Sequence, residues 1–478
     1  MNASVNQFVN AFKTVPVAAR TANNMKAQKS TMSPVVDLFY NIGASRGKNI
    51  NAQWEAAYQA DPDLAIRIAL WTRDARGGAG ERQLFRDVLL HMEKFHREDL
   101  LNTKILAKVP ELGRWDDLLV FTDLDVRSKA YDLIRQALAE GNGLCAKWMP
   151  RKPSKDVSKE AFLALRSALG LSPKAYRKLL VNNTHVVETA MCAKDYAAVN
   201  YSHVPSLAMS RYMTAFMKND MTGFTAYRES LKKGEAKVNA AAVYPYDIIK
   251  SLKAGGDVSV NDAQWAALPD YMDGTNVLPL VDVSGSMGCS AGKNGNVTCL
   301  DVALSLGLYC ADKNKGAFKD MFLTFSERPE LLQLKGSLSQ KMVQMNRSAW
   351  SMNTNLHKAF EKILNLATVA NVPQADMPSV LLILSDMQFD QCAQYDDSAM
   401  QMIERKYEAA GYKVPTIVFW NLNAAYGNAP VSYNKKGVAL VSGFSPAIMK
   451  AVLAADFDDL SPETIVRDAV SIPRYDYR

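Results

Sequence analysis

The 478-residue chain lacks the features that mark membrane and secreted proteins. No apolar run reaches the ~18 residues that a membrane-spanning helix needs, and residues 1–29 lack the charged and then apolar layout of a signal peptide. The six cysteines include no Cys-x-x-Cys pair, which argues against a zinc module and for a reducing compartment. We therefore expect a cytoplasmic protein with no membrane partner, in which free thiols are favoured over a bridge between Cys289 and Cys299.

The sequence also lacks the residue combinations of common hydrolases. Only five histidines are present, and no Ser/His/Asp arrangement is recognisable. No nucleophile is paired with a nearby base. We therefore expect that the protein is not an enzyme.

Positive charge is unevenly distributed along the chain. The net charge is +7, yet residues 276–478 carry 19 Lys and Arg against 20 Asp and Glu. The whole positive excess therefore lies in the first 275 residues. This imbalance indicates either a polyanionic partner such as RNA or an ordinary basic helical surface.

Two or three domains are expected at this length, and the residue pattern changes near position 275. We interpret residues 1–30 as a flexible arm with a short helix at 5–12. From 31 to 272, apolar residues recur three or four apart, and no segment of any length before about 275 alternates as a strand does. Repeated short helices separated by turns predict an all-α domain, stacked as a HEAT-like solenoid or a ring.

From 276 to 455, strands and helices alternate. This order predicts a doubly wound, Rossmann-like α/β domain with a mainly parallel sheet. Residues 456–478 are expected to form a C-terminal helix, capped by Ser461, and a tail that packs on the helical half. Strands are predicted at 277–283, 320–325, 330–334, 379–384, 416–420 and 438–441, and helices at 300–311, 356–366, 397–410 and 446–453.

The segment 277–288 carries the clearest chemical signal. An apolar strand leads into a Gly-flanked turn that presents Asp282, Ser284 and Ser286 beyond the strand's carboxyl end, where ligand sites lie in open α/β sheets. One carboxylate and two hydroxyls are hard oxygen ligands that suit Mg²⁺. The alternative is a polar turn whose Ser and Asp side chains cap the next helix.

Two later loops complete this pattern. Thr354 precedes a predicted helix, and Asp386 follows the apolar strand at 379–384. Together with the Asp-x-Ser-x-Ser turn, these loops resemble the metal-ion-dependent adhesion site (MIDAS) of von Willebrand factor A domains. The resemblance implies one coordination position open to a partner's carboxylate and a Mg²⁺, Mn²⁺ or Ca²⁺ ion held by Asp282, Ser284, Ser286, Thr354 and Asp386.

Basic and aromatic residues recur together in the helical half. Arg and Lys beside Trp are the residue types that hold phosphates and stack unpaired bases. The alternative is that the tryptophans anchor the core and the arginines form ion pairs between helices. The candidate RNA-binding residues are Arg73, Arg76, Arg82, Arg114, Lys147, Trp148, Arg151, Lys152, Arg177 and Lys178.

The whole layout, a basic helical half and then a von Willebrand A domain, resembles the Ro autoantigen family of RNA-binding proteins with its TROVE module. That resemblance implies a ribonucleoprotein in which a helical ring binds structured RNA or single-stranded RNA ends. A second resemblance, to an uncharacterised bacterial, phage and plant family of the same layout, is closer. It rests on segments 72–82, 350–356, 384–390, 418–422 and 437–444.

Three functions follow from these patterns. The first is a non-enzymatic, Ro-like RNA-binding protein with a Mg²⁺-dependent MIDAS for a partner. The second is an adaptor whose metal site captures an acidic residue of a protein such as a MoxR-type AAA+ ATPase. The third is an assembly or structural role, for example in a phage particle.

Overall fold

The computed structural model describes residues 17–151, 156–240, 243–272, 276–291, 297–325, 328–347, 355–391, 396–424 and 427–478. These residues form two compact units, each assembled from separate stretches of the chain. Unit 1 comprises the described residues within Met1–Ile68, Tyr244–Ala254 and Pro269–Ser471. Unit 2 comprises those within Ala69–Val243, Gly255–Leu268 and Ile472–Arg478.

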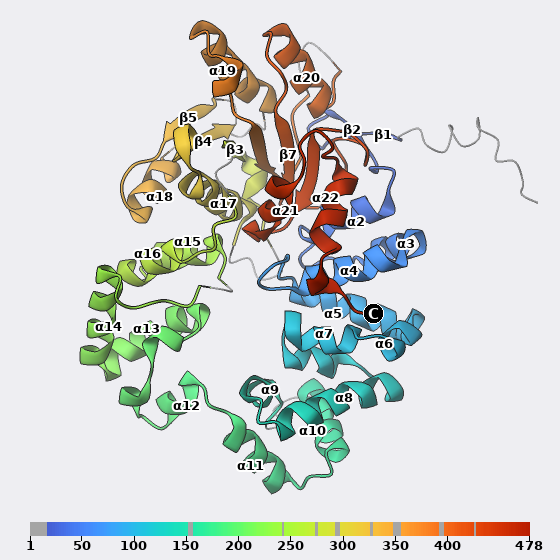
Figure 1. Cartoon of the computed structure of the whole chain (residues 1–478), viewed down its shortest axis with the longest axis vertical. Coiled ribbons are helices and arrows are strands. Elements are labelled where there is room, and N and C mark those ends of the chain that lie inside the picture. The colour runs from blue at the N-terminus through green and yellow to red at the C-terminus, as the bar shows by residue number, and fades with distance from the viewer. Residues whose placement is uncertain are drawn as a thin grey trace, which may run out of the picture. The chain divides into compact units, whose positions relative to one another are not determined.

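Unit 1 is built on a six-stranded sheet of order β5-β4-β3-β6-β7-β8 (Figure 1). All neighbouring strands are parallel except the antiparallel pair β4 and β5. Every residue of β3, β6, β7 and β8 is buried, which explains the nearly continuous apolar runs in the sequence. The sheet confirms the predicted mainly parallel α/β domain, with strands β3 Val277–Asp282, β4 Met321–Phe325, β5 Glu330–Gln333, β6 Val380–Ser385, β7 Thr416–Asn421 and β8 Val438–Ser442.

Helices cover the sheet of unit 1. Helix α17 packs against β3, β4 and β6, while α2 and α22 pack against β8 and against each other. Helix α19 contacts β4 and α20. The helices are α2 Pro34–Ile42, α3 Asn51–Ala60, α15 Pro245–Lys253, α17 Cys299–Lys313, α18 Leu338–Asn346, α19 Leu356–Val369, α20 Ala399–Ala409, α21 Met449–Ala454 and α22 Pro462–Val470.

Helix α2 belongs to the α/β unit although it lies near the start of the chain. The Ser442 hydroxyl, at the end of β8, donates to the Phe39 carbonyl at 2.9 Å and accepts from the Gly43 N–H at 3.1 Å. A Cβ at position 43 would lie 2.7 Å from the Ser442 carbonyl oxygen. The close approach of the two backbones therefore requires glycine there.

The expectation of no strand before position 275 was wrong. Strands β1 (Ala18–Arg20) and β2 (Lys26–Gln28) form an antiparallel pair in unit 1. Three residues are too few to show alternation, and the pair is held by bridges to segments far along the chain. These bridges join Asn24 to Asp390, Lys26 to Ser398 and Gln28 to Ala429. The predicted helix at 5–12 lies outside the described residues.

Unit 2 is helical, which confirms an all-α region before the sheet. Helix α4 (Pro62–Arg73) crosses the division between the units at Ile68 and Ala69. Many of the helix contacts join elements close in sequence, such as α5 with α6 and α13 with α14. The other elements are α5 Arg82–Phe95, α6 Arg97–Asn102, α7 Ile105–Leu112, the 3-10 helix η1 Trp115–Val120, α8 Leu124–Ala139, α9 Gly143–Trp148, α10 Asp156–Ala168, α11 Pro173–Asn183, α12 Val187–Cys192, α13 Ser206–Asn219, α14 Met221–Lys233 and α16 Val258–Ala266.

The C-terminal tail packs within unit 2, as the sequence predicts. Arg474 donates from Nη2 to Asp74 Oδ1 at 2.9 Å, and the Tyr475 hydroxyl donates to Asp74 Oδ2 at 3.0 Å. The Lys104 N–H donates to the Tyr477 carbonyl at 2.7 Å. Within the described parts of the chain, no helix combines the length and the apolar character needed to cross a membrane.

Candidate metal centre and basic clusters

The two predicted acidic ligands lie at the same edge of the unit 1 sheet. Strands β3 and β6 are parallel neighbours in which Val281 pairs with Leu384. Asp282 is the last residue of β3, and Asp386 directly follows the last residue of β6. Because parallel strands end at a common edge, the register brings the two carboxylates together beyond the carboxyl ends of the strands.

The turn after β3 adds the two serines. The Ser284 N–H donates to Asp282 Oδ1 at 2.9 Å, and the Ser284 and Ser286 Oγ atoms lie 3.1 Å apart. The Ser286 hydroxyl is also hydrogen-bonded to the Asp386 carboxylate. Four of the five predicted ligands therefore form one connected cluster around the 3-10 helix η4 (Gly285–Gly288).

Thr354, the fifth predicted ligand, lies outside the described residues. The described chain resumes at Asn355, whose side-chain oxygen accepts a hydrogen bond from the Lys358 N–H at 3.0 Å and so caps α19. The assignment of Thr354 to the cluster stays a prediction.

The carboxylates of the cluster are held in a setting that disfavours their charge. Burial, followed by repulsion from Asp386, raises the pKa of Asp282 to about 7. Burial also raises the pKa of Asp386, although hydrogen bonds from the Gln388 N–H and from Ser286 oppose the shift. Both side chains are almost fully buried, at 0% and 4% exposure. Two close, desolvated carboxylates therefore favour the uptake of a positive charge, either a proton or a cation.

The donor set fits a hard divalent cation. Two carboxylates and two hydroxyls offer only oxygen ligands, the type that Mg²⁺ and Ca²⁺ prefer. Within the described part of the chain, neither Asp282 nor Asp386 forms an ion pair with a basic side chain. A bound cation would supply the missing positive charge.

Sequence reasoning missed the residues that support this cluster. The buried Ser385 hydroxyl donates to Asp282 Oδ2 at 2.6 Å, and the buried Gln388 side chain accepts from the Ala22 N–H at 2.6 Å. The Thr21 hydroxyl donates to the Phe389 carbonyl at 2.7 Å. The turn between β1 and β2 thus contacts and supports the loop that carries Asp386. The sequence analysis assigned no role to any of these supporting residues.

The backbone of the Asp386 loop is strained. Met387 adopts a φ of 63°, in the left-handed region that residues other than glycine rarely occupy, and its side chain is 4% exposed. Such a conformation costs about 1–3 kcal/mol and persists only where the surrounding structure enforces it. The hydrogen bonds from Thr21 and Ala22 to Phe389 and Gln388 hold the loop in this conformation.

In unit 2, three of the six candidate RNA-binding arginines pair with aspartates. Asp117 is fully buried and accepts from Arg73 at 2.8 Å and from Arg82 at 2.9 Å. Burial alone would raise the pKa of Asp117, but the charge of Arg73 and the hydrogen bond from Arg82 outweigh it and lower that pKa. Arg86 also binds Asp117, and Arg114 binds the neighbouring Asp116 at 2.9 Å. We refer to Asp116, Asp117 and these four arginines as the arginine cluster.

The remaining candidates occupy varied settings. Arg114 stacks over the Trp148 ring, with its guanidinium carbon 3.2 Å from the ring centroid. Lys147 pairs with Glu188 at 3.1 Å, and Arg151 donates to the Thr184 hydroxyl at 2.6 Å. Lys152 lies outside the described residues. Four candidates have exposed side chains, namely Arg76, Arg151, Arg177 and Lys178. The structure therefore gathers part of the set around Asp116 and Asp117 and leaves the rest dispersed.

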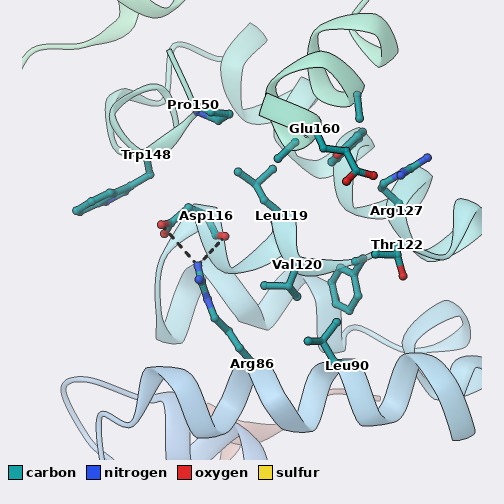
Figure 2. A pocket seen from close by; sticks show the side chains of 14 residues that line it. Arg86, Leu90, Asp116, Leu119, Val120, Thr122, Arg127, Trp148, Pro150 and Glu160 are labelled. Atoms are coloured by element: carbon teal, nitrogen blue, oxygen red, sulfur yellow. Dashed lines mark hydrogen bonds and ion pairs between the residues drawn. The ribbon is translucent and has the colours of Figure 1, made fainter. Parts of the chain in front are cut away.

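A cavity of about 840 Å³ opens beside the arginine cluster in unit 2 (Figure 2). Trp148 and Arg86 border it near Asp116, and Arg127 and Glu160 lie elsewhere on its wall. Aromatic and aliphatic side chains form much of its surface, including Phe121, Tyr131, Leu90, Leu119 and Val120. This volume is within the usual range for small-ligand sites.

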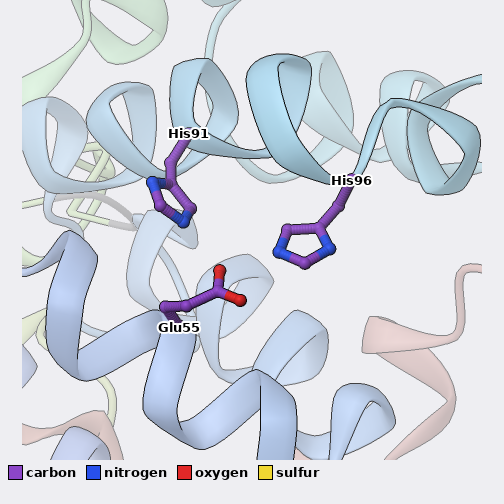
Figure 3. Close-up of side chains that lie close together, drawn as sticks. All are labelled: Glu55, His91 and His96. Atoms are coloured by element: carbon purple, nitrogen blue, oxygen red, sulfur yellow. The ribbon is translucent and has the colours of Figure 1, made fainter.

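Two histidines that the sequence analysis did not single out lie at the end of α5. The ring centroids of His91 and His96 are 6.1 Å apart (Figure 3), and the His91 ring lies 4.7 Å from that of Phe95. A spacing of five residues matches no helical ligand motif, so the sequence gave no reason to pair them. The rings form a small aromatic cluster with Phe95.

Comparison with known proteins gives matches over most of the chain. A relative, "Uncharacterized protein L728" of Acanthamoeba polyphaga mimivirus, is 28% identical over 92% of this chain and 86% of its own length. A solved structure, "Crystal structure of Deinococcus radiodurans RO (RSR) protein", matches with a TM-score of 0.38 and 13% identity, over 91% of this chain and 93% of that chain. The von Willebrand A and TROVE resemblances stay predictions at this level of likeness.

Two family models match the chain in succession. "Domain of unknown function (DUF7788)" matches residues 276–471. "Domain of unknown function (DUF2828)" matches residues 21–137 and 142–275, which is more than half of the chain. The chain therefore belongs to the DUF2828 family.

Proposed function

We propose that unit 1 binds a divalent cation, preferentially Mg²⁺, through Asp282, Ser284, Ser286 and Asp386, and that this ion binds an acidic side chain of a protein partner. The observation that carries the proposal is a pair of buried carboxylates that no basic side chain in the described part of the chain neutralises. Burying a charge without a partner is costly. A cation from solution is the natural compensating charge.

The chemistry of the ligands supports capture of a carboxylate. Mg²⁺ prefers six oxygen ligands in near-octahedral geometry and readily keeps some water ligands. Four side chains, with Thr354 as a predicted fifth, leave at least one position for exchange. A bound ion would supply a positive charge that an Asp or Glu of the partner can ligate. Mn²⁺ suits the same ligands, whereas Ca²⁺ usually takes more of them.

Thermal unfolding with and without Mg²⁺ tests the cation. An ion that binds only the folded state adds about 2.7 kcal/mol of stability at a hundred times its dissociation constant. We expect this gain in the parent protein and its loss in Asp386→Asn. Asp397→Asn is the matched control, because Asp397 lies beyond the same loop but pairs with Arg405. An equal gain in the parent protein and Asp386→Asn would refute the site.

Purification from the native source tests the partner. A protein that ligates the ion, for example a MoxR-type AAA+ ATPase, should co-purify in Mg²⁺, dissociate in EDTA and be absent with Asp386→Asn. The Asp397→Asn protein should retain it. If the same proteins co-purify with all three chains and resist EDTA, the ion does not mediate partner binding.

A second candidate function, binding of single-stranded RNA by unit 2, is favoured by the cavity beside Trp148. Its lining combines aromatic rings with the guanidinium group of Arg127, which suits an unpaired base and its phosphate. The ion pairs of the arginine cluster count against a larger role for Arg73 and Arg82, because those side chains are already engaged.

Binding of a labelled single-stranded RNA over a range of salt concentrations tests this second candidate. Stacking of a base on Trp148 predicts a loss of about 1–3 kcal/mol in Trp148→Leu. Trp115→Leu serves as the control, since Trp115 does not line the cavity. Affinity should also fall steeply with salt because phosphate contacts release counterions. Equal affinities of the two variants, or a flat salt response, would exclude the cavity as an RNA site.

A further inference from the structure

We propose that Cys289 and Cys299 form a redox-active dithiol site that closes reversibly to a disulfide by exchange with a low-molecular-weight disulfide such as oxidised glutathione. Their Sγ atoms lie 3.3 Å apart. None of the comparisons assigns a role to either residue, and the inference does not depend on cation binding.

The backbone already holds the two cysteines opposite each other. The Cys299 N–H donates to the Cys289 carbonyl at 3.0 Å, and the next residues, Ser290 and Thr298, form an antiparallel bridge. Paired residues on such a ladder have Cα atoms about 5.5 Å apart, which lies within the range that a disulfide spans. Closing the bond therefore needs sulfur atoms to approach, with little backbone movement.

The surroundings distinguish the two thiols. Cys289 is half-buried, whereas Cys299 is fully buried at the start of α17. The Asn423 side-chain amide donates a hydrogen bond to Cys289 Sγ at 3.3 Å. Cys289 is therefore the reachable thiolate and Cys299 the resolving thiol.

Lys48 is connected to Cys289 through the side chain of Asn423. The Lys48 amine donates to Asn423 Oδ1 at 2.9 Å, so that Asn423 links it to Cys289. Burial lowers the pKa of Lys48, and negative charge on Cys299 and Cys289 opposes that shift. An amine near a thiol favours the thiolate form.

The exchange proceeds in two balanced steps. The Cys289 thiolate attacks one sulfur of the low-molecular-weight disulfide, forming a mixed disulfide and releasing one thiolate. Cys299 loses its proton to solvent and attacks Cys289 Sγ, which releases the second thiolate. The small disulfide is reduced to two thiols, and the protein is oxidised to a Cys289–Cys299 disulfide.

The other described cysteines provide internal references. Cys145 and Cys310 are buried, and burial raises the pKa of each thiol. Cys192 is exposed and lies in unit 2. Accessibility alone would direct oxidation to Cys192, whereas the dithiol site directs it to Cys289.

Peptide mass analysis of the full chain tests the inference after treatment with oxidised glutathione and alkylation of the remaining thiols. We expect a cross-linked Cys289–Cys299 peptide in the parent protein that dithiothreitol reverses. Cys299→Ser should instead accumulate a glutathione adduct on Cys289, because the resolving thiol is missing. Cys289→Ser should leave Cys299 without an adduct in the folded protein.

Two results would overturn the dithiol site. One is a parent protein in which Cys289 and Cys299 are alkylated as fully after oxidation as before it. The other is a Cys299→Ser protein whose glutathione adduct lies on Cys192 and not on Cys289. Circular dichroism of each variant verifies the fold, and the parent protein alone decides the question if a variant is unfolded.

Discussion

The two units contain two pairs of aspartates with opposite electrostatic settings. In unit 2, Asp116 and Asp117 are surrounded by arginines, which hold the pKa of Asp117 below its ordinary value. In unit 1, burial raises the pKa of both Asp282 and Asp386, and repulsion from Asp386 adds to the shift of Asp282. The difference teaches that burial alone does not identify a ligand site. The informative feature is a buried charge whose compensation the chain does not itself provide.

Removal of Asp117 should produce the largest effect. Asp117→Asn leaves Arg73, which is only 3% exposed, without its carboxylate. Breaking a buried ion pair on one side costs about 3–5 kcal/mol. Hydrogen exchange of α5 and η1 should report this loss of stability. Asp132→Asn is the control because it removes an exposed ion pair, and it should change the stability by less than about 0.5 kcal/mol. An equal loss of stability in Asp117→Asn and Asp132→Asn would show that the arginines around Asp117 do not compensate its buried charge.

Removal of an aspartate in unit 1 should change stability in the opposite direction when no cation is bound. Without a divalent cation, Asp386→Asn removes the repulsion with Asp282 and should stabilise the sheet by about 1 kcal/mol. With Mg²⁺ present the same substitution should destabilise unit 1 relative to the parent protein. Urea unfolding in EDTA and in Mg²⁺ measures both signs. A variant that is less stable in both buffers would show that Asp386 acts only through its hydrogen bonds.

The units should also differ in their pH response. Because the pKa of Asp117 is lowered from 3.8, its contribution to unit 2 is complete above that pH and is lost as the pH falls through the folded pKa. Burial raises the pKa of Asp247, in unit 1, to about 6, so its ionisation destabilises α15 as the pH rises from 3.8 through 6. Protection of α15 amides should increase between about pH 7 and pH 5. Asp247→Asn should abolish that increase, and protection unchanged in the parent protein would contradict it.

The sequence was most informative where the physics is local. Strands β3 and β6 appear as apolar runs, and the polar residues that follow them predict the ligand cluster because parallel strands end at one edge. The turn that carries Ser284 and Ser286 could be predicted from its own residues alone, because its hydrogen bonds are local. Such features depend on neighbours in the chain or on one strand pairing.

The remaining features depend on contacts between distant residues. The arginine at position 73 and its partner Asp117 are 44 residues apart, and no local pattern reveals their pairing. The contact of Phe39 with Ser442 joins residues 403 positions apart, and the β1–β2 pair forms against segments near positions 390–429. The sequence analysis gave ion pairs between helices only as an alternative, and it could identify neither the partners within the arginine cluster nor the contacts of Thr21 and Ala22 with the Asp386 loop.

Equilibrium dialysis against Mn²⁺ tests the central claim most directly, that the uncompensated carboxylates of unit 1 bind a divalent cation. The account predicts one Mn²⁺ per chain in the parent protein and in Asp116→Asn, competition by Mg²⁺, and no bound ion in Asp386→Asn. A parent protein that retains no Mn²⁺, or an Asp386→Asn protein that retains as much as the parent, would contradict it.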